Sequence, residues 1–333
     1  MENPYKSKLP NDVNYFIAGY LLIIAIASVL GNAILIITSL RRFSKLKAPE
    51  FLLVNLALSD LLGAIFMYPL SIVSAFSHEW LGGELTCAYY GLMGFLHGGA
   101  SITTFMLLAI VRCIISFSAH YPRKWLTRKK LLIIIALVWI HSLWWALMPL
   151  WGCGKYGPEP HGLSCTLAWG ELREAGGLSF IFSSFAFMLV FPAIVIVTCY
   201  TCIACRLSSQ HRRTEGCRRM SHQIRVVQRV VLMAVLMSAG FLVAWIPYAA
   251  VSFWLIFNPT SPLPPVVSLL PTLFAKSATT FNPIILYIMS SHFRCNARKL
   301  VADVCLGVKA SVATAETSLQ HECEIMSNDN ALS

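Results

Sequence analysis

Seven long apolar segments dominate this chain and constrain its fold more than any other feature. Each holds about 20 or more mostly apolar residues, enough for a helix to cross about 30 Å of hydrocarbon at about 1.5 Å per residue. The sequence therefore predicts an all-α membrane protein built as a seven-transmembrane helix bundle. We place the spans at 14–40, 51–75, 87–115, 131–151, 178–205, 226–257 and 264–288.

The composition agrees with a membrane protein. Hydrophobic residues make up 57% of the 333 residues and charged residues only 12%. A soluble domain is nearer about half apolar and about a quarter charged. A net charge of +11 would suit a nucleic-acid-binding protein, but the distribution of the charge excludes that function.

Most of the 26 Lys and Arg residues lie in alternate loops, which predicts the orientation of the chain. The opposite set of loops has only Lys6, Lys8, Lys155 and Arg173. This asymmetry predicts a multi-pass protein with its N-terminus extracellular and its C-terminus cytoplasmic. We expect the protein in the plasma membrane. Contact with anionic lipid is a second interpretation of the same basic loops.

We divide the chain into an extracellular N-terminus (1–13), a transmembrane domain (14–288), a surface helix (289–305) and a cytoplasmic tail (306–333). Apolar and basic residues share the third part in a pattern typical of a short amphipathic helix lying at the membrane surface. Its cysteines, Cys295 and Cys305, are candidates for palmitoylation. The tail is polar, and we expect it to be disordered.

The cysteines predict one disulfide and no metal site. Only Cys87, Cys153 and Cys165, of eleven cysteines, fall on the oxidising side of the membrane. One disulfide and one leftover thiol are therefore expected there. No pair of cysteines has a histidine partner at a spacing that suggests a metal.

Few polar side chains interrupt the spans. They include Asn32, Asp60, Lys276 and Asn282. An ionisable group inside a membrane is costly, so it should face the bundle and mark function. We expect Asp60 and Asn282 to share a polar core with Asn32, either as a structural hydrogen-bond knot or as a network that rearranges during switching.

Prolines interrupt three spans at Pro192, Pro247 and Pro283. Each frees a backbone carbonyl and allows a bend, which membrane helices tolerate. Trp245 and Tyr248 flank the second of these prolines. Aromatic side chains at this spacing belong either to helix packing or to the wall of a pocket.

Several motifs, in order and at their spacings, resemble the rhodopsin class of G protein-coupled receptors from about residue 15 to 305. They are Gly31-Asn32, "NLALSD" ending at Asp60, Cys87 with Arg112 25 residues later, Trp139, Pro192 with Tyr200, "WIPY" at 245–248 and Asn282-Pro283. The segment "FAKSATTFNP" resembles the retinal-attachment segment of opsins, with Lys276 six residues before the Asn-Pro. "AGFLVAWIPYA" and "PEPHGLSCTL" are most similar to the neuropsin group of non-visual opsins.

Lys276 lies about twelve residues from either end of its predicted helix, or about 18 Å of rise, too far for the side chain to reach water. Removal from water favours a neutral amine, which can attack an aldehyde. The resemblance implies that this aldehyde is retinal, 11-cis or all-trans, held as a Schiff base. Tyr90, Trp245 and Tyr248 would line the same site. The alternative is a structural lysine paired with Asp60.

A protonated Schiff base is a buried cation and needs an anion nearby. In the visual pigments that the chain resembles, a glutamate lies three residues after the span-three cysteine, where this chain has Tyr90. The resemblance pairs Cys87 with Cys165, which would draw the loop over the bundle mouth and bring Glu159 inward. We therefore predict Glu159 as the counterion, with a solvated loop glutamate as the alternative.

The cytoplasmic half departs from the family pattern. The usual acid-Arg-aromatic triplet reads "VRC" at 111–113, so Arg112 lacks the adjoining acid. In the Asn-Pro-x-x-Tyr motif, Leu286 replaces the tyrosine and Tyr287 comes one residue late. A shift of one residue turns a side chain by about 100°, which would carry Tyr287 away from Tyr200. These departures put G protein coupling in doubt, or predict raised activity in the dark.

Together these features predict a light-sensing receptor rather than an enzyme. Photoisomerisation would lead to activation of a heterotrimeric G protein, with receptor kinase and arrestin as further partners. We assign switching and coupling to Asp60, Arg112, Tyr200, Asn282, Pro283 and Tyr287. One alternative is a retinal photoisomerase or retinal store that signals weakly. The other is a receptor for a diffusible ligand that Lys276 binds ionically.

Overall fold

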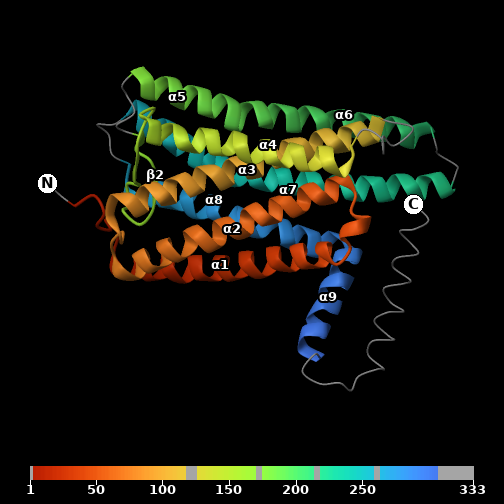
Figure 1. Ribbon diagram of the computed structural model, residues 1–333. Helices are drawn as coiled ribbons and strands as arrows, with labels where there is room; N and C mark the ends of the chain where they lie inside the picture. Colours follow the sequence, from red (N-terminus) through yellow and green to blue (C-terminus); the bar gives the residue numbers. More distant parts are fainter. Residues whose placement is uncertain (1–2, 118–125, 170–174, 214–217, 259–262, 307–333) are drawn as a thin grey trace.

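A computed structural model describes residues 3–117, 126–169, 175–213, 218–258 and 263–306 of the chain. Long helices run side by side in a bundle, and a short helix projects from one end of it (Figure 1). The bundle contains α1 (Asn11–Leu40), α2 (Ala48–Ser77), α3 (Gly83–Phe117), α4 (Arg128–Leu147), α5 (Ala175–Phe185), α6 (Phe191–Arg213), α7 (Arg218–Phe257) and α8 (Pro265–Met289). The projecting helix is α9 (Ser291–Leu306).

The predicted seven-span architecture is confirmed. In the described part of the chain, six segments are long and apolar enough to cross a membrane, and α5 and α6 form one of them through a π-helical turn at Ala186–Val190. The seventh segment, α8, is less apolar because it carries Lys276, Asn282 and two internal prolines, Pro271 and Pro283. The helix that carries the candidate retinal-binding lysine is therefore the span that composition alone identifies least well.

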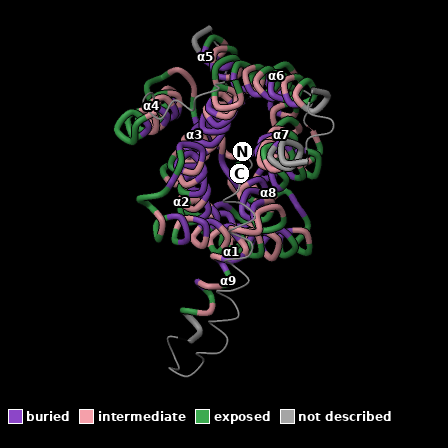
Figure 2. Tube along the Cα trace, turned by 90° about the vertical axis from the view of Figure 1, so that its right-hand side faces the viewer, coloured by how far each residue is buried: buried purple, intermediate pink, exposed green. Residues whose placement is uncertain are grey.

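Helix α3 is the central element of the bundle. It contacts α2, α4, α6 and α7, and it is buried along much of its length (Figure 2). Glycine, alanine, serine and threonine are frequent among its buried residues, and such small side chains allow membrane helices to approach closely.

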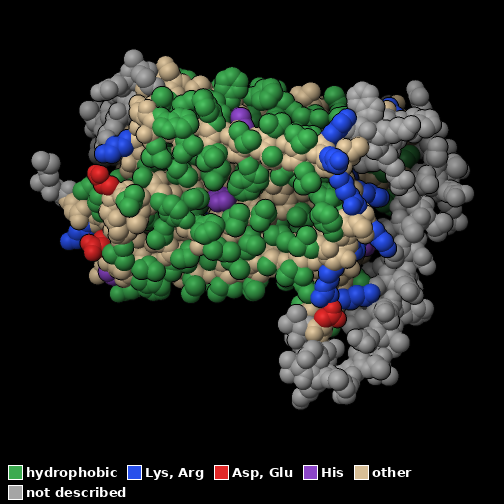
Figure 3. All heavy atoms as spheres, in the orientation of Figure 1, with side chains coloured by type: hydrophobic (Ala, Val, Ile, Leu, Met, Phe, Trp, Pro, Cys, Tyr) green, Lys and Arg blue, Asp and Glu red, His purple; other side chains and the backbone are tan. Residues whose placement is uncertain are grey.

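The surface of the bundle agrees with a membrane environment. Apolar side chains cover the middle of the molecule, and Lys and Arg gather mainly at one end (Figure 3). Large apolar residues such as Ile23 and Ile140 are more than half exposed there. Lipid tails would cover these side chains, because no aqueous phase exists at that depth.

The motifs Gly31-Asn32 and Asn282-Pro283 meet where α1 packs against α8. Proline has no N–H, so Pro283 cannot donate to the carbonyl of Thr279 four residues earlier. The Asn32 amide donates to that carbonyl instead, at 3.0 Å. Gly31 permits this approach, because a Cβ atom there would lie 2.7 Å from Cγ of Pro283. The two motifs thus form one packing unit that positions α8.

The predicted helix after span seven is α9. It buries Phe293 and Leu300 and exposes Arg298, as an amphipathic helix should. Cys295 is also buried, and the side chain of Cys305 lies outside the described residues. Palmitoylation of either cysteine stays a prediction. The tail predicted to be disordered, from residue 307 onward, also lies outside them.

Candidate functional site

A cavity of about 210 Å³ lies inside the bundle. Helices α2, α3, α5, α7 and α8 line it, together with the loop between α4 and α5. All five side chains predicted to form the cofactor site lie on its wall, namely Tyr90, Glu159, Trp245, Tyr248 and Lys276. Residues that are far apart in the sequence therefore converge on one cavity.

The amine of Lys276 lies over the ring of Tyr90, with Nζ 5.6 Å from the ring centroid. Ser71 fixes this ring by donating a hydrogen bond to the Tyr90 hydroxyl at 2.6 Å. Tyr68 donates to the backbone carbonyl of Lys276 at 2.7 Å. No ion pair joins Lys276 to Asp60 among the described residues, so the alternative of a structural lysine paired with that aspartate finds no support.

The loop between α4 and α5 folds over the mouth of the cavity. It forms an antiparallel hairpin of two short strands, β1 (Tyr156–Pro158) and β2 (Cys165–Leu167). The disulfide between Cys87 on α3 and Cys165 on β2 confirms the expected pairing. Cys153 is the leftover thiol. The disulfide therefore ties the hairpin to the central helix as a lid.

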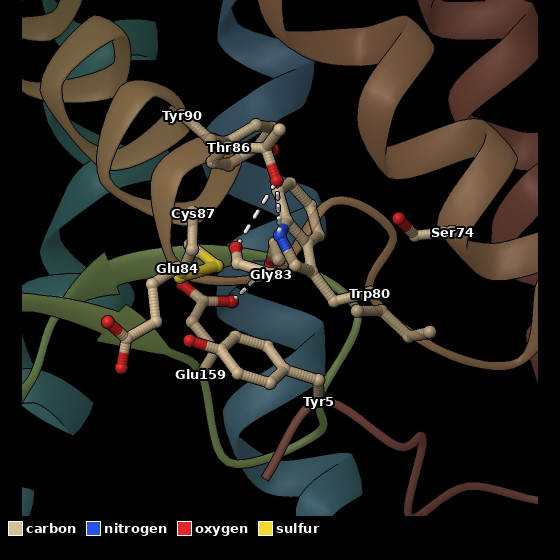
Figure 4. The surroundings of a disulfide bond; sticks show 12 residues. Tyr5, Ser74, Trp80, Gly83, Glu84, Thr86, Cys87, Tyr90 and Glu159 are labelled. Carbon is tan, nitrogen blue, oxygen red and sulfur yellow. Dashed lines mark hydrogen bonds between the residues drawn. A yellow bond between two sulfur atoms is a disulfide. The ribbon is translucent and has the colours of Figure 1, made fainter.

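Glu159 follows β1 directly and lies in the surroundings of the disulfide (Figure 4). Its Oε2 atom accepts hydrogen bonds from His161 Nε2 at 2.6 Å, Ser164 Oγ at 2.6 Å and Thr272 Oγ1 at 3.2 Å. Burial raises the pKa of Glu159, but its interactions with His161, Lys276 and Ser164 together outweigh burial and lower the pKa below its ordinary value. With only 7% of its surface exposed, Glu159 is not a solvated loop side chain.

A row of glycines on α3 borders the cavity. Gly91, Gly94 and Gly98 all line it, at a spacing that places them along one face of the helix. A Cβ atom at Gly98 would lie 3.3 Å from the Trp245 ring, and one at Gly91 would overlap the Tyr156 ring. The absence of side chains at Gly91 and Gly98 therefore lets the rings of Tyr156 and Trp245 approach the backbone of α3 at the edge of the cavity.

Aromatic side chains of α7 line the cavity next to these glycines. Trp245 makes an edge-on contact with Tyr248 and a tilted one with Phe241, each with ring centroids 5.7 Å apart. The Tyr248 hydroxyl donates to Thr166 Oγ1 of the lid at 2.7 Å. The indole N–H of Trp245 is buried and has no hydrogen-bond partner in the described part of the chain. Mostly apolar walls with one amine, that of Lys276, and two carboxylates, Glu159 and Asp60, fit an apolar aldehyde such as retinal.

A polar cluster lies at the end of the cavity between α2, α3 and α8. Asn282 donates to Asp60 Oδ2 at 2.8 Å, and Ser101 donates to Asp60 Oδ1 at 3.4 Å. The predicted meeting of Asp60 with Asn282 is therefore observed. Asn32 was expected in the same cluster, but its amide bonds to the carbonyl of Thr279. Whether the cluster rearranges during switching stays a prediction.

At the end of the bundle near α9, the displaced tyrosine has the predicted orientation. Tyr287 is 46% exposed on the outer surface, while Leu286 is buried in the position where the family motif has tyrosine. Tyr200 instead shares a hydrogen bond with Ser238 at 3.5 Å. Arg112 lies close enough to Tyr200 to interact electrostatically with it. Tyr287 therefore does not belong to the interior cluster around Tyr200.

Sequence analysis missed two residues of the site, His161 and Thr272. Both donate to the carboxylate of Glu159. Thr272 precedes Lys276 by four residues, so helical spacing alone would have placed the two on one face. His161 carried no comparable signal, because its position depends on the turn of the hairpin.

Comparison with known proteins identifies the class of the molecule. Residues 31–286 match the family described as "7 transmembrane receptor (rhodopsin family)". The chain is 37% identical to Opsin-5 of Mus musculus over 300 residues, which cover 88% of this chain and 78% of that protein. It is 33% identical to "Rhodopsin, G0-coupled" of Mizuhopecten yessoensis over 290 residues, or 85% and 71% of the two chains.

The crystal structure of squid rhodopsin has the same fold, with a TM-score of 0.80, 24% identity and 97% of each chain covered. The chain therefore belongs to the rhodopsin family of seven-transmembrane receptors, and within it to the opsins. The similarity to Opsin-5 confirms the expected resemblance to the neuropsin group. Opsins are light-sensing receptors whose members bind retinal as chromophore.

Proposed function

We propose that this opsin holds retinal covalently through a Schiff base to Lys276 and activates a heterotrimeric G protein after photoisomerisation. The observation that carries the proposal is the convergence of Lys276 and Glu159 on one cavity with mostly apolar walls. Bound retinal supplies the light absorption and the change of shape. The residues of the chain orient it, compensate its charge and exclude water.

Glu159 is the proposed counterion. It is the acidic side chain that reaches the cavity from the lid, and its electrostatic interaction with Lys276 supports this role. Tyr90 occupies the place of the glutamate found in visual pigments and offers a polarisable ring to the same cation. The disulfide to α3 holds the lid over the cavity mouth, and partial removal of the half-buried Lys276 from water strengthens the attraction between the two charges.

We propose that Trp245 is the first side chain to move when the ligand changes shape. Its ring lies against Gly98 on α3 and packs on Phe241, which precedes it by one helical turn on α7. A displaced ring would press on α7, which can bend at Pro247 because that residue cannot donate the usual backbone hydrogen bond. Two packings of one bundle that differ by a few kcal/mol are sufficient for such a switch.

The G protein would bind the basic end of the bundle, where Lys and Arg gather (Figure 3). That end is cytoplasmic under the positive-inside rule, which places the N-terminus outside the plasma membrane. A relative named as a G0-coupled rhodopsin supports a G protein partner. Receptor kinase and arrestin would act at the same end.

A weakly signalling photoisomerase is the second candidate. Val111 and Leu286 are both buried among apolar side chains where the family pattern has an acid and a tyrosine. These two positions therefore lack the polar groups that the pattern provides for switching. Light-dependent nucleotide exchange on a purified G protein separates the candidates, because only the receptor accelerates exchange in the light.

Absorption spectra of the purified chain with 11-cis and with all-trans retinal, before and after illumination, test the covalent site. We expect a band that shifts with light, and borohydride should trap a retinyl group on Lys276. Lys276→Ala should abolish both results. Lys155→Ala is the matched control, since that lysine is exposed beside Glu84 outside the cavity. Covalent retinal on the Lys276→Ala protein would refute the proposal.

A further inference from the structure

His161 is almost fully buried in the lid, and its two ring nitrogens have different partners. Nδ1 lies 3.1 Å from the backbone nitrogen of Leu163. Nε2 lies 2.6 Å from Oε2 of Glu159. The backbone N–H of Lys8, from the N-terminal segment, donates to the His161 carbonyl at 3.3 Å. The imidazole is therefore held on both sides and also through its own backbone.

These contacts determine which nitrogen carries the proton. A backbone N–H can only donate, so Nδ1 must accept from Leu163 and cannot itself be protonated. Nε2 then carries the single N–H of a neutral ring and donates it to the carboxylate of Glu159. The backbone turn of the hairpin thereby selects the tautomer that stabilises an anion.

We propose that His161 is a positioning residue that keeps Glu159 ionised and aims its carboxylate into the cavity toward Lys276. The inference deepens the proposed function, because it assigns the control of the counterion to a side chain of the lid. The histidine needs no charge of its own for this role. Its contribution is a hydrogen bond that only the ionised form of Glu159 accepts at full strength.

The other groups around Glu159 leave this role to His161. Ser164 and Thr272 also donate to Oε2, but both are hydroxyls that can rotate to accept from a protonated carboxyl. The charged or titratable side chains that interact with Glu159 in the described residues are His161, Lys276 on α8 and Tyr248 on α7. His161, Ser164 and Thr272 are the three uncharged donors to Glu159. Only the imidazole of His161, whose tautomer is fixed, cannot change from donor to acceptor in this hydrogen bond.

Two substitutions separate this role from a role in folding the loop. His161→Asn keeps a polar group near the position of Nδ1, and so keeps the Leu163 contact, but it is too short to reach Glu159. His161→Gln places an amide N–H near the position of Nε2, and so keeps the donor to Glu159. Each variant preserves one of the two contacts and removes the other.

The protonation of Glu159 is measured on the full-length chain without retinal. The infrared band of the protonated carboxyl is followed against pH and assigned by its absence in Glu159→Gln. We expect the titration midpoint to rise by about one to two pH units in His161→Asn, the size of a hydrogen bond to a charged group. His161→Gln should titrate like the wild type. The acid-induced absorbance shift of the retinal-bound chain should follow the same order.

Equal midpoints for wild type and His161→Asn would overturn the inference. So would equal shifts in both variants, which would indicate a loop-folding role. The apoprotein measurement does not require retinal, so its result stands even if no pigment forms. A raised titration midpoint of Glu159 in His161→Asn, in a protein that forms no pigment with retinal, would refute the proposed function and support the role of His161. A protein that forms the pigment, but whose Glu159 titrates with the same midpoint in wild type and in His161→Asn, would support the proposed function and refute the role of His161.

Discussion

Replacing Gly31 with alanine should destabilise the molecule through the contact between α1 and α8. The added Cβ atom would lie 2.7 Å from Cγ and 2.8 Å from Cβ of Pro283, much closer than carbon atoms pack. The proline ring is rigid and lies inside α8, so it cannot turn aside as a flexible side chain would. The two helices must therefore separate by several tenths of an ångström or more.

The cost has two parts that can be estimated from the structure. Overpacking of a close contact costs about 1–3 kcal/mol. Separation also weakens the 3.0 Å hydrogen bond from Asn32 to the Thr279 carbonyl, which Pro283 leaves without its usual donor. An unsatisfied buried carbonyl adds about 1–3 kcal/mol. We expect Gly31→Ala to lose about 2–4 kcal/mol in the free energy of unfolding, because the two effects overlap.

Unfolding in mixed detergent micelles, followed by circular dichroism, measures this loss. Gly19→Ala is the matched control, because it lies on the same helix and a Cβ atom there would meet nothing within 4 Å. That control should be neutral or stabilised by up to about 1 kcal/mol through the helix propensity of alanine. A Gly31→Ala protein as stable as the Gly19→Ala protein would refute the close-contact argument. Loss of stability in both would point to a general effect of alanine in α1.

Three further predictions concern the lid and the two ends of the bundle. The pKa of Glu159 is lowered in the fold, so its carboxylate contributes stability above the ordinary value of 4.5 that is lost as the pH falls below it. Glu159→Gln should flatten this part of the pH profile of thermal unfolding; an unchanged profile would contradict the assignment. Double replacement of Cys87 and Cys165 by alanine should cost about 4 kcal/mol, because the disulfide closes a chain separation of 78 residues. A shift in melting temperature tests this, and a stability equal to the wild type would oppose it. Tyr287→Phe should leave light-dependent nucleotide exchange unchanged, since the side chain lies on the outer surface; a large loss would place it in the switch.

The bundle could be predicted from the sequence because hydrophobic length is a local property. Counting apolar residues placed all seven spans, including the one that carries Lys276. The convergence of Lys276 with Glu159 was also within reach, since one disulfide between cysteines at known places carries the loop to the bundle mouth.

The inner surface of the site could not be predicted from the sequence. The strands of the lid are three residues long and include Gly157 and Pro158, so they show no alternating pattern. The glycines of α3 look like ordinary membrane-helix glycines until Trp245 and Tyr156 are placed against them. His161 acquires its role only from a tautomer that the amide of a neighbouring residue selects. Each of these properties depends on three-dimensional contacts that local sequence does not encode.

The two ends of this bundle are stabilised differently: charged, polar and aromatic groups surround Lys276, whereas apolar packing surrounds Val111 and Leu286. Around Lys276 the structure supplies a carboxylate, aromatic rings and a hairpin that lies over the mouth of the cavity. Around Val111 and Leu286, apolar side chains join the main hydrophobic cluster where the family pattern has an acid and a tyrosine. Apolar packing is screened little by salt, unlike an exposed ion pair. Under the proposed function, the resting state at these two positions would depend on buried area, which must be given up if the helices separate on activation. Under the proposed function, substitutions around Val111 and Leu286 should alter nucleotide exchange and spare pigment formation, whereas loss of Lys276 should abolish both the pigment and light-dependent exchange.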